Sequence, residues 1–172
     1  LKEAARLIEM AVEQGARLVA LPEYFGIMGL KDTDKVAVRE AYGSGPIQEF
    51  LAATARKHGI WIVGGSVPLV ASVKDKVLNT SLVYDDKGKR VARYDKIHLF
   101  GFSMGKEHYS EERTIEHGTQ VVTVDTPFAR IGLSICYDVR FPELYRALAV
   151  RGATILFVPA AFRFETGVDH WE

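Results

Sequence analysis

A segment near the start of the chain is repeated near its end. Residues 15–25 (GARLVALPEYF) align without gaps on residues 152–162 (GATILFVPAAF). In both copies a helical pattern closes at Gly-Ala, a short apolar run follows, and a proline ends that run. A helix that leads into a buried strand packs against a sheet. The repeat therefore predicts sheets covered by helices. It arises either from two similar units that converged or from two related halves that place their strand ends side by side.

The hydrophobic pattern of the remaining chain adds further elements. Apolar residues at helical spacing predict helices over residues 1–14, from 46 to about 59, and from 144 to 152. Residues 24–44 are expected to form a long, partly helical connection, and residues 97–119 a long loop without regular structure. Short apolar or alternating runs predict strands at 18–21, 60–63, 77–84, 89–94, 121–124, 131–135 and 154–158.

The charge balance of the chain argues against two classes of partner. Lys and Arg together number 22, as do Asp and Glu, so the formal net charge is zero. A nucleic-acid binder or a polybasic membrane anchor would carry a basic excess. No apolar run approaches the roughly 20 residues that span a bilayer. We therefore expect neither a nucleic-acid nor a membrane partner.

The chain contains one cysteine, Cys136. A single cysteine excludes an internal disulfide framework and a Cys-rich metal site. A lone thiol is also typical of a reducing compartment, which favours a cytoplasmic location. No histidine spacing resembles a metal site, so no metal is expected.

Cys136 lies where an apolar strand meets a polar turn and then a helix. A tight turn at such a junction presents the side chain, and nearby backbone N–H groups can face a developing oxyanion. A helix N-terminus close by would also favour the thiolate over the thiol. The pattern fits a nucleophile, and it fits equally a cysteine that simply ends a buried strand.

A thiol nucleophile needs a proton acceptor and a charged partner. Among the histidines, His98 is the best candidate for a Cys–His pair, but no third group that would orient it is evident. Glu23 follows a predicted strand, where open α/β sheets build their sites, and Ala160 takes its place in the second copy of the repeat. Lys96 lies between hydrophobic neighbours at the end of another predicted strand. Taken singly, either charge is also explained by ion pairing at the surface.

Several segments together resemble the nitrilase superfamily of carbon–nitrogen hydrolases, in the order and with the spacing of that family. The resemblance covers essentially the whole chain. It is closest to the Nit-type amidase branch, which includes omega-amidases and deaminated glutathione amidases. Plain nitrilases more often have Trp-Glu after the cysteine, whereas this chain has Tyr137-Asp138. The matching segments are residues 21–23, 64–66, 79–80, 94–100, 132–143 and 166–172.

The resemblance implies a Glu-Lys-Glu-Cys site. Glu23 matches the general base, Lys96 the lysine that stabilises the oxyanion, and Cys136 the nucleophile. The second glutamate of the family lies in an aromatic-x-Glu pattern shortly before Thr-hydrophobic-x-x-Gly. That pattern selects Glu111, with the adjacent Glu112 as the alternative if the loop is shifted by one residue.

Two further residues are candidates for contact with the substrate. The backbone N–H of Tyr137 is expected to be a second oxyanion donor, next to Lys96. Arg140 is either a bidentate partner for a substrate carboxylate or a salt-bridge partner of a nearby acid. Glu143 is interpreted as structural. The scheme needs no organic cofactor.

The fold that the resemblance implies is α/β, an α-β-β-α sandwich. Residues 1–172 would form a single carbon–nitrogen hydrolase domain that lacks the family's first strand and its C-terminal part, and that forms a homodimer or higher homo-oligomer when full length. The implied activity is hydrolysis of a non-peptide C–N bond in a small amide through a cysteine thioester. A nitrile or N-carbamoyl amino acid hydrolase with the same site, and a non-catalytic interaction module of the same fold, are the alternatives.

Overall fold

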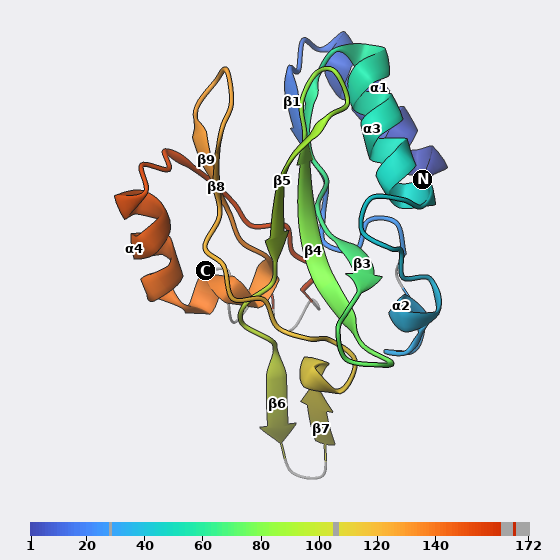
Figure 1. The fold of residues 1–172 in the computed structure, drawn as a ribbon, viewed down its shortest axis with the longest axis vertical. Coiled ribbons are helices and arrows are strands. Elements are labelled where there is room, and N and C mark those ends of the chain that lie inside the picture. Colours follow the sequence, from blue (N-terminus) through green and yellow to red (C-terminus); the bar gives the residue numbers. More distant parts are fainter. Residues whose placement is uncertain (28, 105–106, 163–166, 168–172) are drawn as a thin grey trace.

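A computed structural model describes residues 1–27, 29–104, 107–162 and 167. Two β-sheets lie face to face between helices (Figure 1). Helices α1 (Lys2–Glu13) and α3 (Pro46–His58) cover the outer side of one sheet, and α4 (Pro142–Val150) covers the outer side of the other. This layering confirms the predicted α/β class and the α-β-β-α order. No helix within the described ranges is long and apolar enough to cross a membrane.

The first sheet is built around one long central strand, β4 (Val77–Tyr84). On one side β4 pairs antiparallel with β2 (Trp61–Val63) and β3 (Val67–Val70), and on the other side with β5 (Arg90–Asp95). Strand β1 (Leu18–Ala20) pairs parallel with β2. The β4–β5 pair is the hairpin that the sequence predicts.

The second sheet has the order β10-β9-β8. Strand β9 (Arg130–Leu133) pairs antiparallel with β8 (Thr123–Asp125) and parallel with β10 (Ile155–Phe157). A 3-10 helix, η2 (Cys136–Arg140), follows β9 and leads into α4. The strand–turn–helix junction expected at the cysteine is therefore present.

The core divides into two clusters of buried side chains. One lies between the first sheet and its helices and includes Ile8, Leu51 and Ile62, which are 0–1% exposed. The other lies between the two sheets, where Val83 and Tyr94 of the first sheet share a cluster with residues of β9. Because apolar side chains from both sheets remove each other from water, this inter-sheet cluster holds the two strand ends that carry the site.

Helix α3 begins at a proline and ends at a glycine, as the sequence predicts. Pro46 is the first residue of α3, and Gly59 ends that helix in the left-handed conformation at φ +62°. The connection over residues 24–44 is partly helical as expected, with α2 at Asp34–Ala37.

One expectation about the middle of the chain is wrong, and one strand there was not predicted. Residues 97–119 are not an unstructured loop, because they contain the hairpin of β6 (Gly101–Met104) and β7 (Glu107–Ser110) and a 3-10 helix, η1 (Glu111–Arg113). This hairpin projects away from the sandwich (Figure 1), so its strands lack the apolar alternation of a core strand. Strand β3 was not expected, because it contains Pro68; proline is tolerated at the edge of the sheet.

The two copies of the repeat occupy matching places in the two sheets. Strand β1 pairs parallel with β2, and β10 pairs parallel with β9. The segments that follow β1 and β10 meet, because the backbone N–H of Ala161 donates to Glu23 Oε2 at 3.0 Å. The strand ends of the repeat therefore lie side by side.

Candidate active site

Lys96 is a fully buried lysine immediately after β5, with 0% exposure. Its backbone is fixed on both sides, since its N–H donates to the Asn79 carbonyl and its own carbonyl accepts from the N–H of Gly118, both within 2.9 Å. Glycine is needed at position 118, because a Cβ there would lie 2.2 Å from the carbonyl oxygen of Asp95. The loop can therefore close tightly over the lysine.

The ammonium group of Lys96 lies between two carboxylates. Its Nζ is 2.9 Å from Glu111 Oε2 and 3.4 Å from Glu23 Oε1. Burial by itself would lower the pKa of this ammonium, but the charges of Glu23 and Glu111 outweigh burial and raise the pKa above its ordinary value. Lys96 is therefore protonated at neutral pH.

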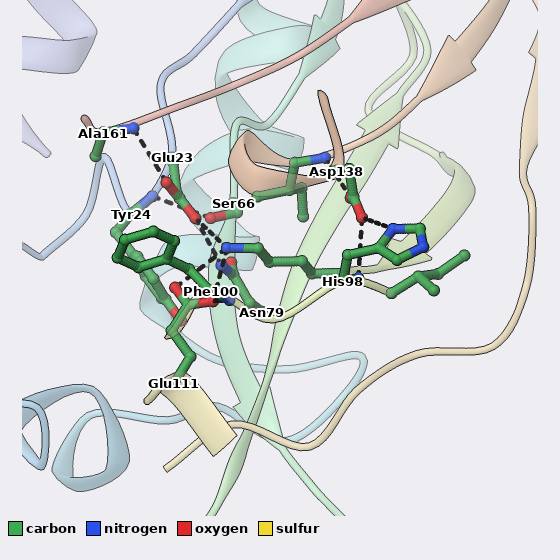
Figure 2. A network of polar contacts seen from close by, with 12 residues as sticks. Glu23, Tyr24, Ser66, Asn79, His98, Phe100, Glu111, Asp138 and Ala161 are labelled. Atoms are coloured by element: carbon green, nitrogen blue, oxygen red, sulfur yellow. Dashed lines mark hydrogen bonds and ion pairs between the residues drawn. The ribbon is translucent and has the colours of Figure 1, made fainter. Parts of the chain in front are cut away.

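Glu23 lies three residues beyond the end of β1 and is 4% exposed. Its Oε1 accepts a hydrogen bond from Asn79 Nδ2 at 2.8 Å in addition to the lysine contact. Its Oε2 accepts from the Ala161 N–H (Figure 2). Three donors from three separate chain segments thus hold the carboxylate in one orientation, as a buried ionised acid requires.

The turn around Glu23 is shaped by a close backbone approach. Gly65, which follows β2, has φ +53°, and a Cβ there would lie 2.0 Å from the carbonyl oxygen of Pro22. Ser66 Oγ then accepts the N–H of Tyr24 at 3.0 Å, and Tyr24 itself has φ +49°. The glycine and the serine together fix the position of the carboxylate-bearing turn.

Glu111 begins the 3-10 helix η1 and is 9% exposed. Both of its oxygens contact Lys96 Nζ, and Oε2 also accepts the N–H of Phe100 at 2.8 Å. The neighbouring Glu112 is exposed. Of the two glutamates that the sequence leaves open, the structure brings Glu111 to the lysine.

Cys136 lies at the first position of η2 and is 8% exposed. Its φ of +49° places it in the left-handed region, which costs a residue other than glycine about 1–3 kcal/mol. The backbone conformation is held by a hydrogen bond from its N–H to the Pro159 carbonyl at 2.9 Å. Such strain at a strand-to-helix turn is typical of a nucleophile whose side chain the turn exposes to the substrate.

The thiol of Cys136 lies within the electrostatic influence of both Glu23 and Lys96. Burial and then the negative charge of Glu23 raise the pKa of the thiol to about 12, although the charge of Lys96 and the Ala161 N–H act in the opposite direction. The resting state is therefore a protonated thiol next to a carboxylate. Glu23 is placed to take that proton.

The structure does not bring every candidate into this group. Arg140 is exposed, and its side chain has no hydrogen-bond or ion-pair partner within the described part of the chain. Tyr137 packs its ring edge-on against Phe100 and Phe141, with centroids 5.1 and 5.6 Å apart. The expected oxyanion role of the Tyr137 N–H stays a prediction. Glu143 is exposed and pairs with Arg146 within α4, and its structural role stays a prediction.

His98 is not the partner of the cysteine. Its Nδ1 lies 2.7 Å from Asp138 Oδ1, and its ring stacks on Phe141 with centroids 3.6 Å apart. An Asp138 contact could also orient a catalytic histidine, but the groups that act on the Cys136 thiol are Glu23, Lys96 and the Ala161 N–H. The structure therefore favours Glu23 over the Cys–His alternative.

Two functional contacts were missed at the sequence level. Asn79 is a fully buried amide in strand β4, which is buried along nearly its whole length, and its Oδ1 has no hydrogen-bond partner among the described residues. An amide within such a strand was the available signal, because buried polar side chains require a reason. The Ala161 N–H carries no side-chain signal. Among the described residues, no cluster of His, Cys, Asp or Glu is arranged to hold a metal ion.

Comparison with known proteins agrees with these features. The model of the family "Carbon-nitrogen hydrolase" matches residues 1–172. A deaminated glutathione amidase from Synechocystis sp. is 43% identical, over 100% of this chain and 64% of that protein. Omega-amidase NIT2 of Homo sapiens is 39% identical, over 98% of this chain and 60% of that protein. The chain thus spans about 60–64% of the length of these two relatives.

A solved structure has the same fold. The crystal structure of Nit3 from Saccharomyces cerevisiae, a member of branch 10 of the nitrilase superfamily, superimposes with a TM-score of 0.85 at 33% identity. The match covers 99% of this chain and 61% of that one. The α-β-β-α architecture is therefore that of nitrilase superfamily structures.

Proposed function

Because the chain belongs to the carbon–nitrogen hydrolase family, we propose that it hydrolyses the C–N bond of a small linear amide through a thioester on Cys136, releasing ammonia and a carboxylate. The observation that carries this proposal is the buried ammonium of Lys96 between Glu23 and Glu111, together with the buried thiol of Cys136, on which the charges of Glu23 and Lys96 both act. A base, a cation and a nucleophile converge in one site.

In the first half of the reaction the thiol attacks the amide. Glu23 takes the Cys136 proton, and the thiolate forms a bond to the amide carbon. The carbonyl oxygen becomes an oxyanion, which Lys96 and the Tyr137 N–H stabilise; one such donor contributes about 3–4 kcal/mol to catalysis. Glu23 returns the proton to the leaving nitrogen, the C–N bond breaks, and ammonia departs from the thioester.

In the second half water releases the acyl group. Glu23 accepts a proton from water, and the resulting hydroxide attacks the thioester carbon. The same two donors stabilise the second oxyanion, which collapses as the C–S bond breaks. The thiolate recovers a proton from Glu23. Throughout, Glu111 holds the Lys96 ammonium by its two oxygen contacts, so that the cation faces the reacting carbon in both steps.

The substrate class is inferred from the family branch. Both relatives described above are named as amidases, one a deaminated glutathione amidase and the other an omega-amidase. We infer a small amide with a terminal carboxamide, and Arg140 is a candidate partner for a carboxylate on the same molecule. Its exposure leaves the guanidinium accessible.

Three properties of the protein as a whole are part of the proposal. Residues 1–172 belong to one hydrolase domain, which the cluster shared between the two sheets supports. The lone thiol favours a cytoplasmic location. The family resemblance favours a homodimer or a higher homo-oligomer, whose size sedimentation or light scattering would measure.

Ammonia release tests the activity and separates it from the alternatives. The protein is incubated with α-ketoglutaramate, deaminated glutathione, a simple nitrile and an N-carbamoyl amino acid, with Cys136→Ala as the control. We expect ammonia from at least one of the two amides and none from the Cys136→Ala variant. Turnover of the nitrile or the carbamoyl compound alone would favour the other hydrolase classes. No turnover of any of the four would favour a non-catalytic module.

A further inference from the structure

Asp138 is a third buried acid near the site, after Glu23 and Glu111; its exposure is 0%, and the mechanism above does not use it. Its carboxylate accepts four hydrogen bonds. Tyr94 OH lies at 2.7 Å and the N–H of Ile135 at 2.8 Å. The N–H and the Nδ1 of His98 lie at 3.0 and 2.7 Å (Figure 2). All donors that a buried carboxylate needs are thus supplied by protein groups.

These four donors come from two segments on different sheets. Tyr94 and His98 lie two positions before and two positions after Lys96, at the end of β5 of the first sheet. The remaining donor lies immediately before Cys136, after β9 of the second sheet. One carboxylate therefore ties the backbone that carries the lysine to the backbone that carries the cysteine.

We propose that Asp138 is a positioning residue that sets the distance between the Lys96 ammonium and the Cys136 thiol. The inference rests on the hydrolase function proposed above. The carboxylates of Glu23 and Glu111 hold only the tip of the lysine, whereas Asp138 links the two chain segments from which the reacting side chains project. Proper spacing of reacting groups matters, because a displacement of about 1 Å can lower the rate roughly 100-fold.

The side-chain donors to Asp138 are themselves held in place. The ring of His98 stacks on Phe141 at an interplanar angle of 7°. Tyr94 is fully buried, and burial together with the charge of Asp138 raises the pKa of its hydroxyl far above the usual range, so it remains a donor. Phe141 follows η2 directly. The same turn therefore supplies both the carboxylate and the surface that orients one of its donors.

Asp138→Asn is the direct test. The amide keeps the shape of the side chain, but its NH₂ group is a donor and cannot accept the hydrogen bonds that the carboxylate oxygen accepts. Glu40→Gln is the matched control. Glu40 is also a buried carboxylate, 5% exposed, which accepts the N–H of Ile47 at 2.6 Å and Nε2 of Gln48 at 3.0 Å. It caps the start of α3 and contributes no contact to the site described above. Each variant loses one buried acid, but only Asp138 links the segment that carries Lys96 to the segment that carries Cys136.

Four quantities are measured on wild type and both variants. They are the melting temperature, kcat and KM for the amide that the wild type hydrolyses, and the rate at which iodoacetamide alkylates Cys136 at pH 8, which intact-mass spectrometry follows. For Asp138→Asn we expect kcat to fall by roughly 100-fold with KM changed less than about threefold. Alkylation should slow by at least about tenfold, because a thiolate farther from Lys96 is less stable. Glu40→Gln should lower the melting temperature and leave kcat and alkylation unchanged.

The outcomes separate the possibilities. Asp138→Asn with a lowered melting temperature but unchanged kcat and alkylation would overturn the proposal, as would equal losses of kcat in both variants. If Asp138→Asn does not fold, Tyr94→Phe and His98→Ala are used instead, because each removes one donor to Asp138. Each should slow the alkylation of Cys136. Unchanged alkylation rates in both variants would overturn the proposal. If the wild type hydrolyses no amide, the proposed function fails, whereas the alkylation rates still decide whether Asp138 positions the thiol.

Discussion

Replacing Lys96 with methionine tests how far the buried site depends on one positive charge. The change keeps an unbranched side chain that reaches the position of Cε and removes the ammonium, which Glu23 and Glu111 approach to 3.4 and 2.9 Å. Lys96 is 0% exposed and the two glutamates are 4% and 9% exposed, so little water reaches the charges left behind. Removing one partner of a buried ion pair costs about 3–5 kcal/mol. We expect Lys96→Met to lose that much free energy of unfolding and all measurable turnover.

Urea unfolding followed by circular dichroism measures this loss. Glu111→Gln in the Lys96→Met background removes one of the stranded charges, so the double variant should be more stable than Lys96→Met alone. The exposed pair of Lys57 and Glu9, 3.6 Å apart, provides the control, and Lys57→Met should change stability little. A loss below about 1 kcal/mol for Lys96→Met, or no recovery in the double variant, would refute the reasoning, because a buried pair would then behave like a surface pair.

Three further predictions follow from the same site. Glu111→Gln should lower kcat at least about 100-fold by releasing Lys96, whereas Glu112→Gln should leave kcat unchanged; equal effects would contradict the assignment of Glu111. Asn79→Ala removes a donor from the Glu23 carboxylate and should cost about 1.5–3 kcal/mol in urea unfolding, with a lower kcat. The pKa of the Cys136 thiol is raised to about 12 from 9.0, so the folded protein favours the protonated thiol. The resulting contribution to the free energy of unfolding is complete below pH 9 and is lost as the pH rises toward 12. Wild type should therefore lose stability more steeply than Cys136→Ala over that range, and parallel curves would contradict the raised pKa.

The sequence predicted the elements that have strong local signals. The apolar spacing of α1, the proline at the start of α3 and the glycine that ends it are local features, and the structure confirms each of them. The repeat of residues 15–25 at 152–162 left two explanations open, and the structure agrees with the one in which the strand ends lie side by side. Each of these patterns depends on neighbours in the sequence or on an internal comparison.

Elements without a buried face were harder to predict. The β6–β7 hairpin projects from the sandwich, so its strands carry no apolar alternation and appeared as a loop. Strand β3 was hidden by Pro68, which an edge strand accepts. In both cases the pairing is decided by the partner strand, which a local pattern does not reveal.

The site was predictable where a residue type is unusual for its surroundings. Lys96 between hydrophobic neighbours and Glu23 beyond a buried strand could be singled out as candidates. Their roles, like the choice of Glu111, depended on the family pattern. Contacts that join distant segments could not be found in this way. The Ala161 N–H and the link from Asp138 to Tyr94 and His98 exist only because the two sheets face each other.

The central claim is that the acyl group of the substrate passes through the sulfur of Cys136. Intact-mass spectrometry of the protein, quenched in acid within seconds of mixing with the amide it hydrolyses, tests this directly. We predict an added mass equal to the acyl group, carried on the peptide that contains Cys136, lost on treatment with hydroxylamine and absent in Cys136→Ala. Hydrolysis of the amide by Cys136→Ala at the wild-type rate, or an acyl group on any other residue, would contradict it.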